Sequence, residues 1–333
     1  MRMKHATLAV AMMALATGAA RAEPLTIKVG WVTIAASSVP LSLEKKEILV
    51  NYGKTYVIEP IRMASTAAMI TALATGDVNV GTLAYSSLAF AILNAKMEDV
   101  RIVMDTNQDG VGTHSTGAFM VLKDGPIKKV EDLKGKVIAS LTLGSAVDVA
   151  MRGMLRKHGV DDKKDVTFVE AQFPNMKSML LQHKADLIAE NRPWIDDPEL
   201  QDKAKTLFTQ KEATGVTQLL IWASRAGYIK EHRAALVDFL TDALRWTRWE
   251  FEPKNHAEIV DIAARVSKQP RESFDSYLYT DKDLYKDPNG LPNLEALQSN
   301  IDLEKELGFI DKTIVIKNYA DLSMIKEAAE RLK

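Results

Sequence analysis

The chain has 333 residues, of which 47% are hydrophobic and 26% are charged, and it contains no cysteine. Its 43 basic and 44 acidic residues give a net charge of −1, without the basic tail or stripe that nucleic-acid binding requires. The missing cysteine excludes a disulfide framework and an acylated-cysteine lipoprotein anchor, and the length is typical of two domains or lobes.

The first 22 residues have the layout of a secretory signal peptide. Arg2 and Lys4 precede an apolar run over residues 6–16, and Ala20-Arg21-Ala22 fits the small-x-small cleavage pattern. The run is shorter than the roughly 20 residues of a membrane-spanning helix. A buried N-terminal helix is the alternative, but it does not explain the cleavage pattern. We therefore expect removal of residues 1–22 and a freely diffusing protein in the periplasm.

The first part of the mature chain alternates β-like runs with helical runs. Period-two, β-branched runs predict strands over 25–32, 56–62, 78–83 and 101–105, and apolar periodicity predicts helices over 40–49, 65–74 and 85–95. This alternation indicates a parallel sheet that is covered by helices.

The segments that follow three of these strands are rich in hydroxyl groups. They contain Thr33, Ser37, Ser65, Thr66, Tyr85, Ser86 and Ser87. In open α/β sheets ligands bind beyond the carboxyl ends of the strands, and helix N-termini there favour anions. For any single loop, a helix cap is the better explanation of its hydroxyl groups. Three such loops at one edge of a sheet favour a binding cleft.

A second unit repeats the same alternation of strands and helices. Strands are expected over 118–122, 136–140, 166–170 and 185–189, with helices from Gly144-Ser145 to about 158 and over 175–183. A strand from Gln218 then leads to a long helix over 230–251, and a last helix is expected over 322–332.

Five segments carry a resemblance to a known family. They are LTIKVGW, ALATGDVNVGTLAYSSLAFA, the stretch from Gly125 through Gly135 to Gly144-Ser145, HKADLIAENRPW, and the closing GFIDKTIVIKNYADLSMIKEAAERLK. The chain resembles the periplasmic substrate-binding proteins of the nitrate, sulfonate and taurine class of ABC importers, a class that includes binders of thiamine-pyrimidine precursors. The resemblance implies a two-lobed α/β periplasmic-binding-protein fold of type II. Each lobe is then a mostly parallel sheet flanked by helices, with lobe one at 23–115 plus 222–333 and lobe two at 116–221.

The resemblance also implies where the ligand binds, in a cleft between the lobes. It places ligand contacts at Thr33–Ser38, Ser65-Thr66, Tyr85–Ser87, Gly144-Ser145 and Asn191-Arg192.

Two basic residues need separate interpretation. Many relatives carry an acid where this chain has Arg192, whose guanidinium matches a carboxylate, sulfonate or phosphate. An ion pair with Asp196 or Asp197 is the alternative. His114, where the chain is expected to cross between lobes, either donates to an anion or packs at the hinge.

These observations predict the solute-binding component of an ABC importer. We expect a monomer without cofactor or metal that captures a small organic anion, either a sulfonate or a carboxylate, and delivers it to a permease with its ATPase subunit. A binder of an uncharged heterocycle, such as a pyrimidine precursor, and a ligand-presenting sensor subunit are the alternatives. An enzyme is not expected, because the six histidines form no HExxH motif, no GxSxG or Walker motif occurs, and the iron-dependent relative of this fold uses cysteines.

Overall fold

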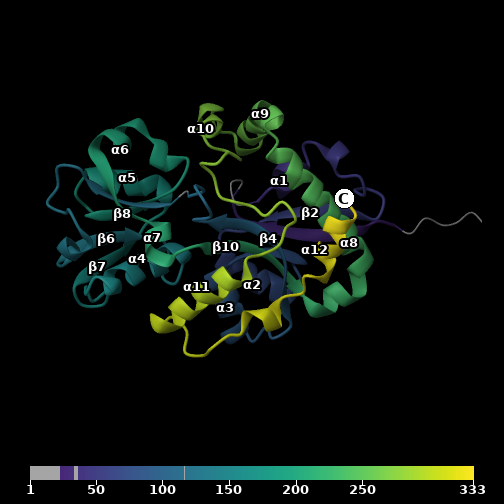
Figure 1. Cartoon of the computed structure of the whole chain (residues 1–333), viewed down its shortest axis with the longest axis horizontal. Helices are drawn as coiled ribbons and strands as arrows, with labels where there is room; N and C mark the ends of the chain where they lie inside the picture. Colours follow the sequence, from purple (N-terminus) through teal and green to yellow (C-terminus); the bar gives the residue numbers. More distant parts are fainter. Residues whose placement is uncertain (1–22, 34–36, 116) are drawn as a thin grey trace, which may run out of the picture.

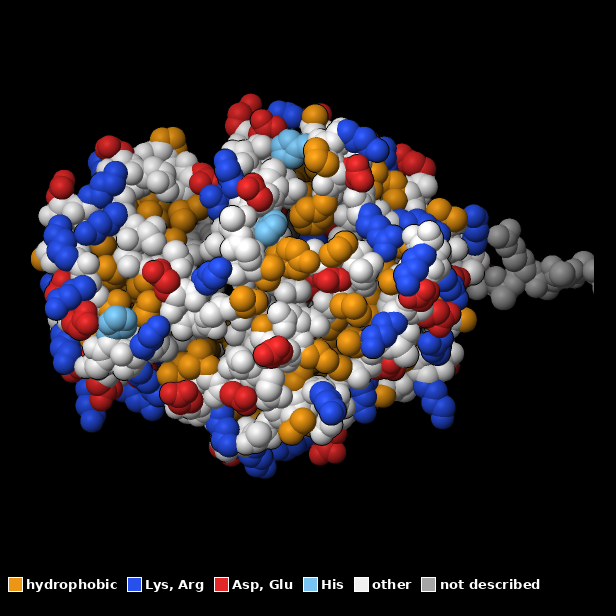
Figure 2. Space-filling view, viewed as in Figure 1, with side chains coloured by type: hydrophobic (Ala, Val, Ile, Leu, Met, Phe, Trp, Pro, Cys, Tyr) orange, Lys and Arg blue, Asp and Glu red, His pale blue; other side chains and the backbone are white. Residues whose placement is uncertain are grey.

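A computed structural model describes residues 23–33, 37–115 and 117–333, so the predicted signal peptide lies outside the described residues. Two lobes lie side by side along the long axis of the molecule (Figure 1). Each lobe contains one five-stranded sheet. An indentation marks their junction at the upper edge of Figure 2, where acidic and basic side chains are interspersed over the visible face.

Lobe one is built on a sheet with the strand order β2-β1-β3-β10-β4. Its strands are β1 (Leu25–Trp31), β2 (Tyr56–Arg62), β3 (Val80–Ala84), β4 (Val100–Asp109) and β10 (Thr217–Arg225). β1 pairs in parallel with β2 and β3, whereas β10 lies antiparallel between β3 and β4. All strands except β10 therefore run the same way, and β4 carries Asp109 to the edge where ligands are expected.

Lobe two has the equivalent arrangement, with the strand order β7-β6-β8-β5-β9. Its strands are β5 (Ala118–Leu122), β6 (Lys136–Ser140), β7 (Val166–Glu170), β8 (Leu187–Glu190) and β9 (Ala204–Thr209). β6 pairs in parallel with β7 and β8, and β5 is the reversed strand between β8 and β9. The prediction of two mostly parallel α/β lobes is confirmed, with one reversed strand in each sheet.

Helices cover both faces of the sheets. They are α1 (Val39–Ser42), α2 (Thr66–Thr75), α3 (Tyr85–Leu93), α4 (Ala146–Lys157), α5 (Phe173–Leu181), α6 (Pro198–Lys203), α7 (Gln210–Thr214), α8 (Ala226–Glu250), α9 (His256–Ser267), α10 (Glu272–Asp275), α11 (Leu294–Glu306) and α12 (Ser323–Glu330). In lobe one, α2, α3 and α11 bury apolar side chains on one face of the sheet, and α8 and α12 pack on the other (Figure 1). None of the helices in the described ranges has the length and apolar character needed to cross a membrane.

Local capping explains where several helices begin. Ser65 caps α2 by accepting a 3.1 Å hydrogen bond from the Ala68 amide, and Ser145 caps α4 by accepting one of 3.2 Å from the Asp148 amide. Gly76 ends α2 with a left-handed φ of 80°, a conformation that glycine adopts without strain.

The predicted helix over 40–49 is wrong. Only α1 and a 3-10 turn over Lys46–Ile48 form there. The backbone of Lys45 has non-helical dihedral angles, with φ of −136° and ψ of 61°. Its ammonium lies 2.6 Å from the Glu258 carboxylate on α9. A contact with a distant helix, which the local apolar pattern does not encode, accompanies this break.

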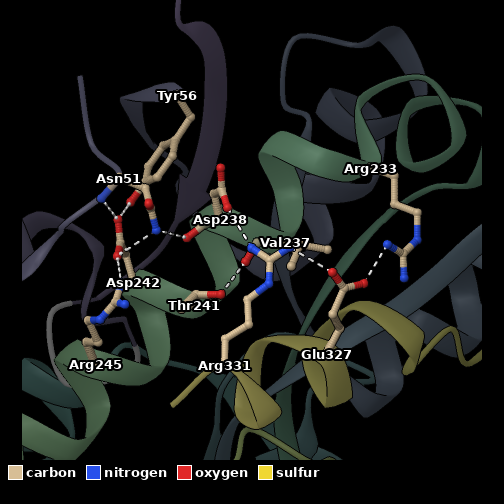
Figure 3. Close-up of polar contacts among 10 residues, drawn as sticks. All are labelled: Asn51, Tyr56, Arg233, Val237, Asp238, Thr241, Asp242, Arg245, Glu327 and Arg331. Atoms are coloured by element: carbon tan, nitrogen blue, oxygen red, sulfur yellow. Dashed lines mark hydrogen bonds and ion pairs between the residues drawn. The ribbon is translucent and has the colours of Figure 1, made fainter. Parts of the chain in front are cut away.

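A buried carboxylate on α8 fastens the loop before β2 to lobe one (Figure 3). Asp242, which is fully buried, accepts hydrogen bonds from the Asn51 amide at 2.8 Å and from the Tyr56 hydroxyl at 2.9 Å, and it forms an ion pair with Arg245. Nearby, Arg331 of the C-terminal segment pairs with Asp238 of α8 at 2.7 Å. The C-terminal helix α12 thus belongs structurally to lobe one.

The chain crosses between the lobes over residues 110–117 and again over 215–216. A short double connection of this kind permits hinge motion of one lobe against the other. β10 joins the sheet of lobe one from Thr217, a few residues before the predicted end of lobe two at residue 221. The lobe boundaries themselves stay a prediction.

Candidate ligand-binding site

A cavity lies between the two lobes, beside the ends of β4 and β8. Asp109 and Leu219 line it from lobe one, and Ala118, Phe119, Ala146, Phe173, Glu190, Asn191 and Gln210 line it from lobe two. Its volume is about 60 Å³, room for only a few water molecules. A larger ligand therefore enters only when the lobes move apart.

Glu190, the last residue of β8, is the most unusual group in this cavity. Its side chain is 1% exposed, and neither carboxyl oxygen has a hydrogen-bond partner in the part of the chain that the structure describes. Burial raises the pKa of Glu190 to about 8, although the backbone and charge of Lys177 oppose part of that shift. An unpaired buried carboxyl group costs stability, which points to a functional reason for its presence.

Two helix N-termini flank the same cavity. α4 begins at Ala146 and α5 begins at Phe173, and both residues line the cavity. Helix N-termini carry partial positive charge, although Pro174 of α5 has no amide N–H and the Asp148 amide of α4 already donates to Ser145. The side chains of Phe119 and Phe173 add apolar walls.

The hydroxyl residues predicted in lobe one lie near its carboxyl edge but are mainly engaged with the protein itself. Ser65 caps α2, and the Ser87 hydroxyl donates to Thr66 Oγ1 at 2.7 Å. Ser86 is buried on α3, and Ser37 is buried against a separate apolar cavity inside lobe one. Thr33 lies just beyond β1 and is exposed. The structure does not gather these side chains around the cavity between the lobes.

Tyr85, Gly144 and Ser145 lie at a seam where the lobes touch. The Tyr85 hydroxyl donates to the Ala146 carbonyl oxygen at 3.4 Å, next to the cavity. Ser145 caps α4, and Gly144 has a left-handed φ of 77° with its Cα facing the Phe90 ring. Burial raises the pKa of Tyr85 well above its usual value, so its hydroxyl stays protonated.

Arg192 is not among the residues that line the cavity. Its guanidinium lies 3.1 Å from the Asp196 carboxylate and donates hydrogen bonds to the carbonyl oxygens of Ser115 at 3.2 Å and Lys282 at 3.0 Å. The ion-pair alternative is therefore what this structure shows. Lys282 belongs to the segment after α10 in lobe one, so Arg192 bridges the two lobes.

Of the remaining predicted residues, Asn191 lines the cavity and His114 does not. The amide oxygen of Asn191 has no hydrogen-bond partner among the described residues. His114 Nδ1 lies 3.0 Å from the Asp283 carbonyl oxygen, and its ring packs against Tyr285 at 5.4 Å. This position agrees with the hinge-packing interpretation of His114.

Sequence reasoning missed Glu190, Asp109, Phe119 and Phe173. One signal was available, because Glu190 is an acid that ends the apolar run ADLIA and directly precedes Asn191. Nothing in the sequence pattern connects Asp109 to Glu190, since they come from different lobes.

The two α/β lobes and the cavity between them define a periplasmic-binding-protein fold. The sequence profile described as NMT1/THI5 like matches residues 57–252, more than half of the chain. The chain belongs to this NMT1/THI5-like family. No curated protein sequence matches it significantly.

Solved structures share the fold at low sequence identity. The periplasmic aliphatic sulphonate binding protein SsuA from Escherichia coli has a TM-score of 0.71 at 18% identity, over 89% of this chain and 92% of that chain. The periplasmic nitrate-binding protein NrtA from Synechocystis PCC 6803 has a TM-score of 0.71 at 15% identity, over 93% and 90%. The desulfurization enzyme DSZB has a TM-score of 0.67 at 13% identity, over 93% and 100%. The fold is thus shared by solute-binding proteins and by an enzyme.

Proposed function

We propose that the protein is the exported solute-binding component of an ABC importer. It captures a small organic molecule between its lobes in the periplasm and delivers it to a permease with its ATPase subunit. The cavity that both lobes line is the observation that carries this proposal. Family membership and the fold shared with sulfonate-binding and nitrate-binding proteins support it. The signal-peptide layout of residues 1–22 supports export.

Two classes of ligand follow from the sequence, and the cavity supports them unequally. An organic anion is favoured by the N-termini of α4 and α5 and by analogy with the sulfonate-binding and nitrate-binding proteins. Against it, no Lys, Arg or His of the described chain lines the cavity, and Arg192 is engaged elsewhere. An uncharged heterocycle that donates hydrogen bonds is favoured by the amide oxygen of Asn191 and by two phenylalanine rings. Of these two classes, the geometry supports the ligand that donates hydrogen bonds better than the anion, because the unpaired oxygens of Glu190 and Asn191 among the described residues need donors.

A thermal-shift screen of residues 23–333 tests the proposal. The panel contains sulfonates, carboxylates, nitrate and nitrogen heterocycles. A ligand at 100 times its dissociation constant adds about 2.7 kcal/mol to the free energy of unfolding, which raises the melting temperature visibly. Calorimetry then checks that one molecule binds per chain and returns unchanged.

The result that contradicts the proposal is chemical turnover of a bound molecule, or the absence of any stabilising compound in a broad library of small solutes. A sensor subunit binds ligand in the same way. Ligand-dependent uptake by vesicles that contain the cognate permease separates import from sensing.

A further inference from the structure

The carboxyl group of Glu190 is placed where a ligand is expected, without a protein partner. Glu190 is buried, lines the cavity between the lobes, and has no hydrogen-bond partner for either oxygen among the described residues. Buried carboxyl groups in proteins are normally paired or hydrogen-bonded. The group therefore lacks the donors that a bound molecule can supply.

The charged side chains around Glu190 do not supply a counter-charge. The charge of Lys177 on α5 favours the carboxylate form of Glu190, but its ammonium lies 2.8 Å from Asp197 and 3.3 Å from Glu199. Asp197 adds a negative charge that favours protonation of Glu190. Asp109 brings a further carboxyl group to the same cavity from lobe one. No Lys, Arg or His of the described chain lines the cavity, so ionisation of Glu190 leaves a negative charge there without a cation beside it.

Once Glu190 is ionised, the polar atoms of Glu190 and Asn191 that have no hydrogen-bond partner among the described residues are all acceptors. They are the two carboxyl oxygens of Glu190 and the amide oxygen of Asn191. A ligand that satisfies them must carry several donors. Phe119 and Phe173 add apolar surface to the same cavity. The complementary molecule has N–H donors that lie side by side, next to an apolar part.

We propose that Glu190 determines ligand specificity, and that the ligand carries an amidinium-type or guanidinium-type cation that donates two parallel N–H bonds to this carboxylate. Such paired bonds match the two oxygens of a carboxylate and are stronger than neutral hydrogen bonds. The inference rests on the proposed function, since it concerns the ligand of the same cleft.

A cation at this position also links binding to lobe closure. Glu190 comes from lobe two and Asp109 from lobe one, so closing the lobes brings two carboxyl groups towards one cavity. A bound cation offsets the repulsion between the ionised forms of these two groups, whereas an anion adds to it. The ligand thereby binds the closed form more tightly than the open form, which is the requirement for ligand-driven closure.

Binding is accordingly expected to release protons. Burial holds the pKa of Glu190 at about 8, with Asp197 opposing ionisation and Lys177 favouring it, so the free protein carries a protonated Glu190 at pH 7. A cationic ligand stabilises the carboxylate and displaces that proton. Its affinity should rise with pH and level off above about pH 8.

Three isosteric probes test the charge of the ligand by titration calorimetry. Benzamidine is a cation, benzamide is neutral and benzoate is an anion, and all three have nearly the same shape. We expect benzamidine to bind at least about tenfold more tightly than the other two, with proton release at pH 7 in buffers of different ionisation enthalpy.

Two matched variants assign the effect to Glu190. Glu190→Gln keeps the shape and removes the charge, and should lower benzamidine affinity by about ten- to a hundredfold. Glu304→Gln is the control, because Glu304 is equally buried and has no hydrogen-bond partner among the described residues, but does not line the cavity. It should leave benzamidine affinity unchanged. Circular dichroism and thermal unfolding verify that both variants fold.

Three results overturn this inference. Benzoate binds more tightly than benzamidine, none of the three probes binds, or Glu190→Gln leaves the benzamidine affinity unchanged. The proposed function survives any of these results if another compound from the screen binds between the lobes. It fails independently, when no solute binds at all or when a bound molecule is converted.

Discussion

Two buried carboxylates, one in each lobe, show how differently the same side-chain chemistry is used in this fold. Asp242 in lobe one has hydrogen bonds from Asn51 and Tyr56 and an ion pair with Arg245 (Figure 3). Glu190 in lobe two is equally buried, yet its oxygens have no partner in the described chain and it borders a cavity. The hydrogen-bonded carboxylate of Asp242 stabilises lobe one, whereas the proposal assigns the unpaired carboxyl group of Glu190 to a bound ligand.

Replacing Asp242 should have the largest effect on stability. Asp242→Asn removes the charge opposite Arg245 and turns amide protons towards donors, so the free energy of unfolding should fall by about 3–5 kcal/mol. Urea denaturation measures this loss. Asp238→Asn, one turn earlier on α8 and more exposed, is the control and should cost less than about 1 kcal/mol. Equal losses in the two variants would remove the distinction between the buried and the surface carboxylate.

Replacing Glu190 should raise the free energy of unfolding at alkaline pH, whereas replacing Asp242 lowers it. Its folded pKa of about 8 exceeds its ordinary value of 4.5, so its stabilising contribution is complete below about pH 4.5 and is lost as the pH rises through 8. Glu190→Gln should therefore be more stable than the natural protein at pH 9 by about 4 kcal/mol relative to the difference at pH 5.

Denaturation of the ligand-free protein at both pH values measures this change. Glu304, whose burial raises its pKa to about 8, should give a similar pH dependence when changed to Gln. Parallel pH profiles of the natural protein and Glu190→Gln would mean that Glu190 is satisfied in solution.

Replacing Arg192 should have the smallest effect. Arg192→Ala removes hydrogen bonds to the carbonyl oxygens of Ser115 and Lys282, and should lower the free energy of unfolding by about 1 kcal/mol. Ligand affinity should change by less than about threefold, because the guanidinium does not line the cavity. Calorimetry with the best compound of the screen checks this. A tenfold weaker affinity with unaltered stability would make Arg192 a ligand contact after all.

The amino-acid sequence by itself determined the class of fold. Strand and helix periodicities are local, so the alternating elements of both lobes were predictable, as were the helix starts at Ser65 and Ser145, where the capping residue lies three positions from the amide it accepts from. The break after α1 was not predictable, because Lys45 contacts a helix more than 200 residues further along the chain.

Only the tertiary structure decided the character of the cleft. The sequence offered Arg192 as an anion anchor, but folding places Asp196 and two carbonyl oxygens around its guanidinium. Folding also brings Glu190 to the same cavity as Asp109, which lies 81 positions earlier in the chain and in the other lobe. The charge of the binding site depends on which side chains are already paired within the protein. Pairing between segments far apart in the sequence cannot be predicted from a local sequence pattern.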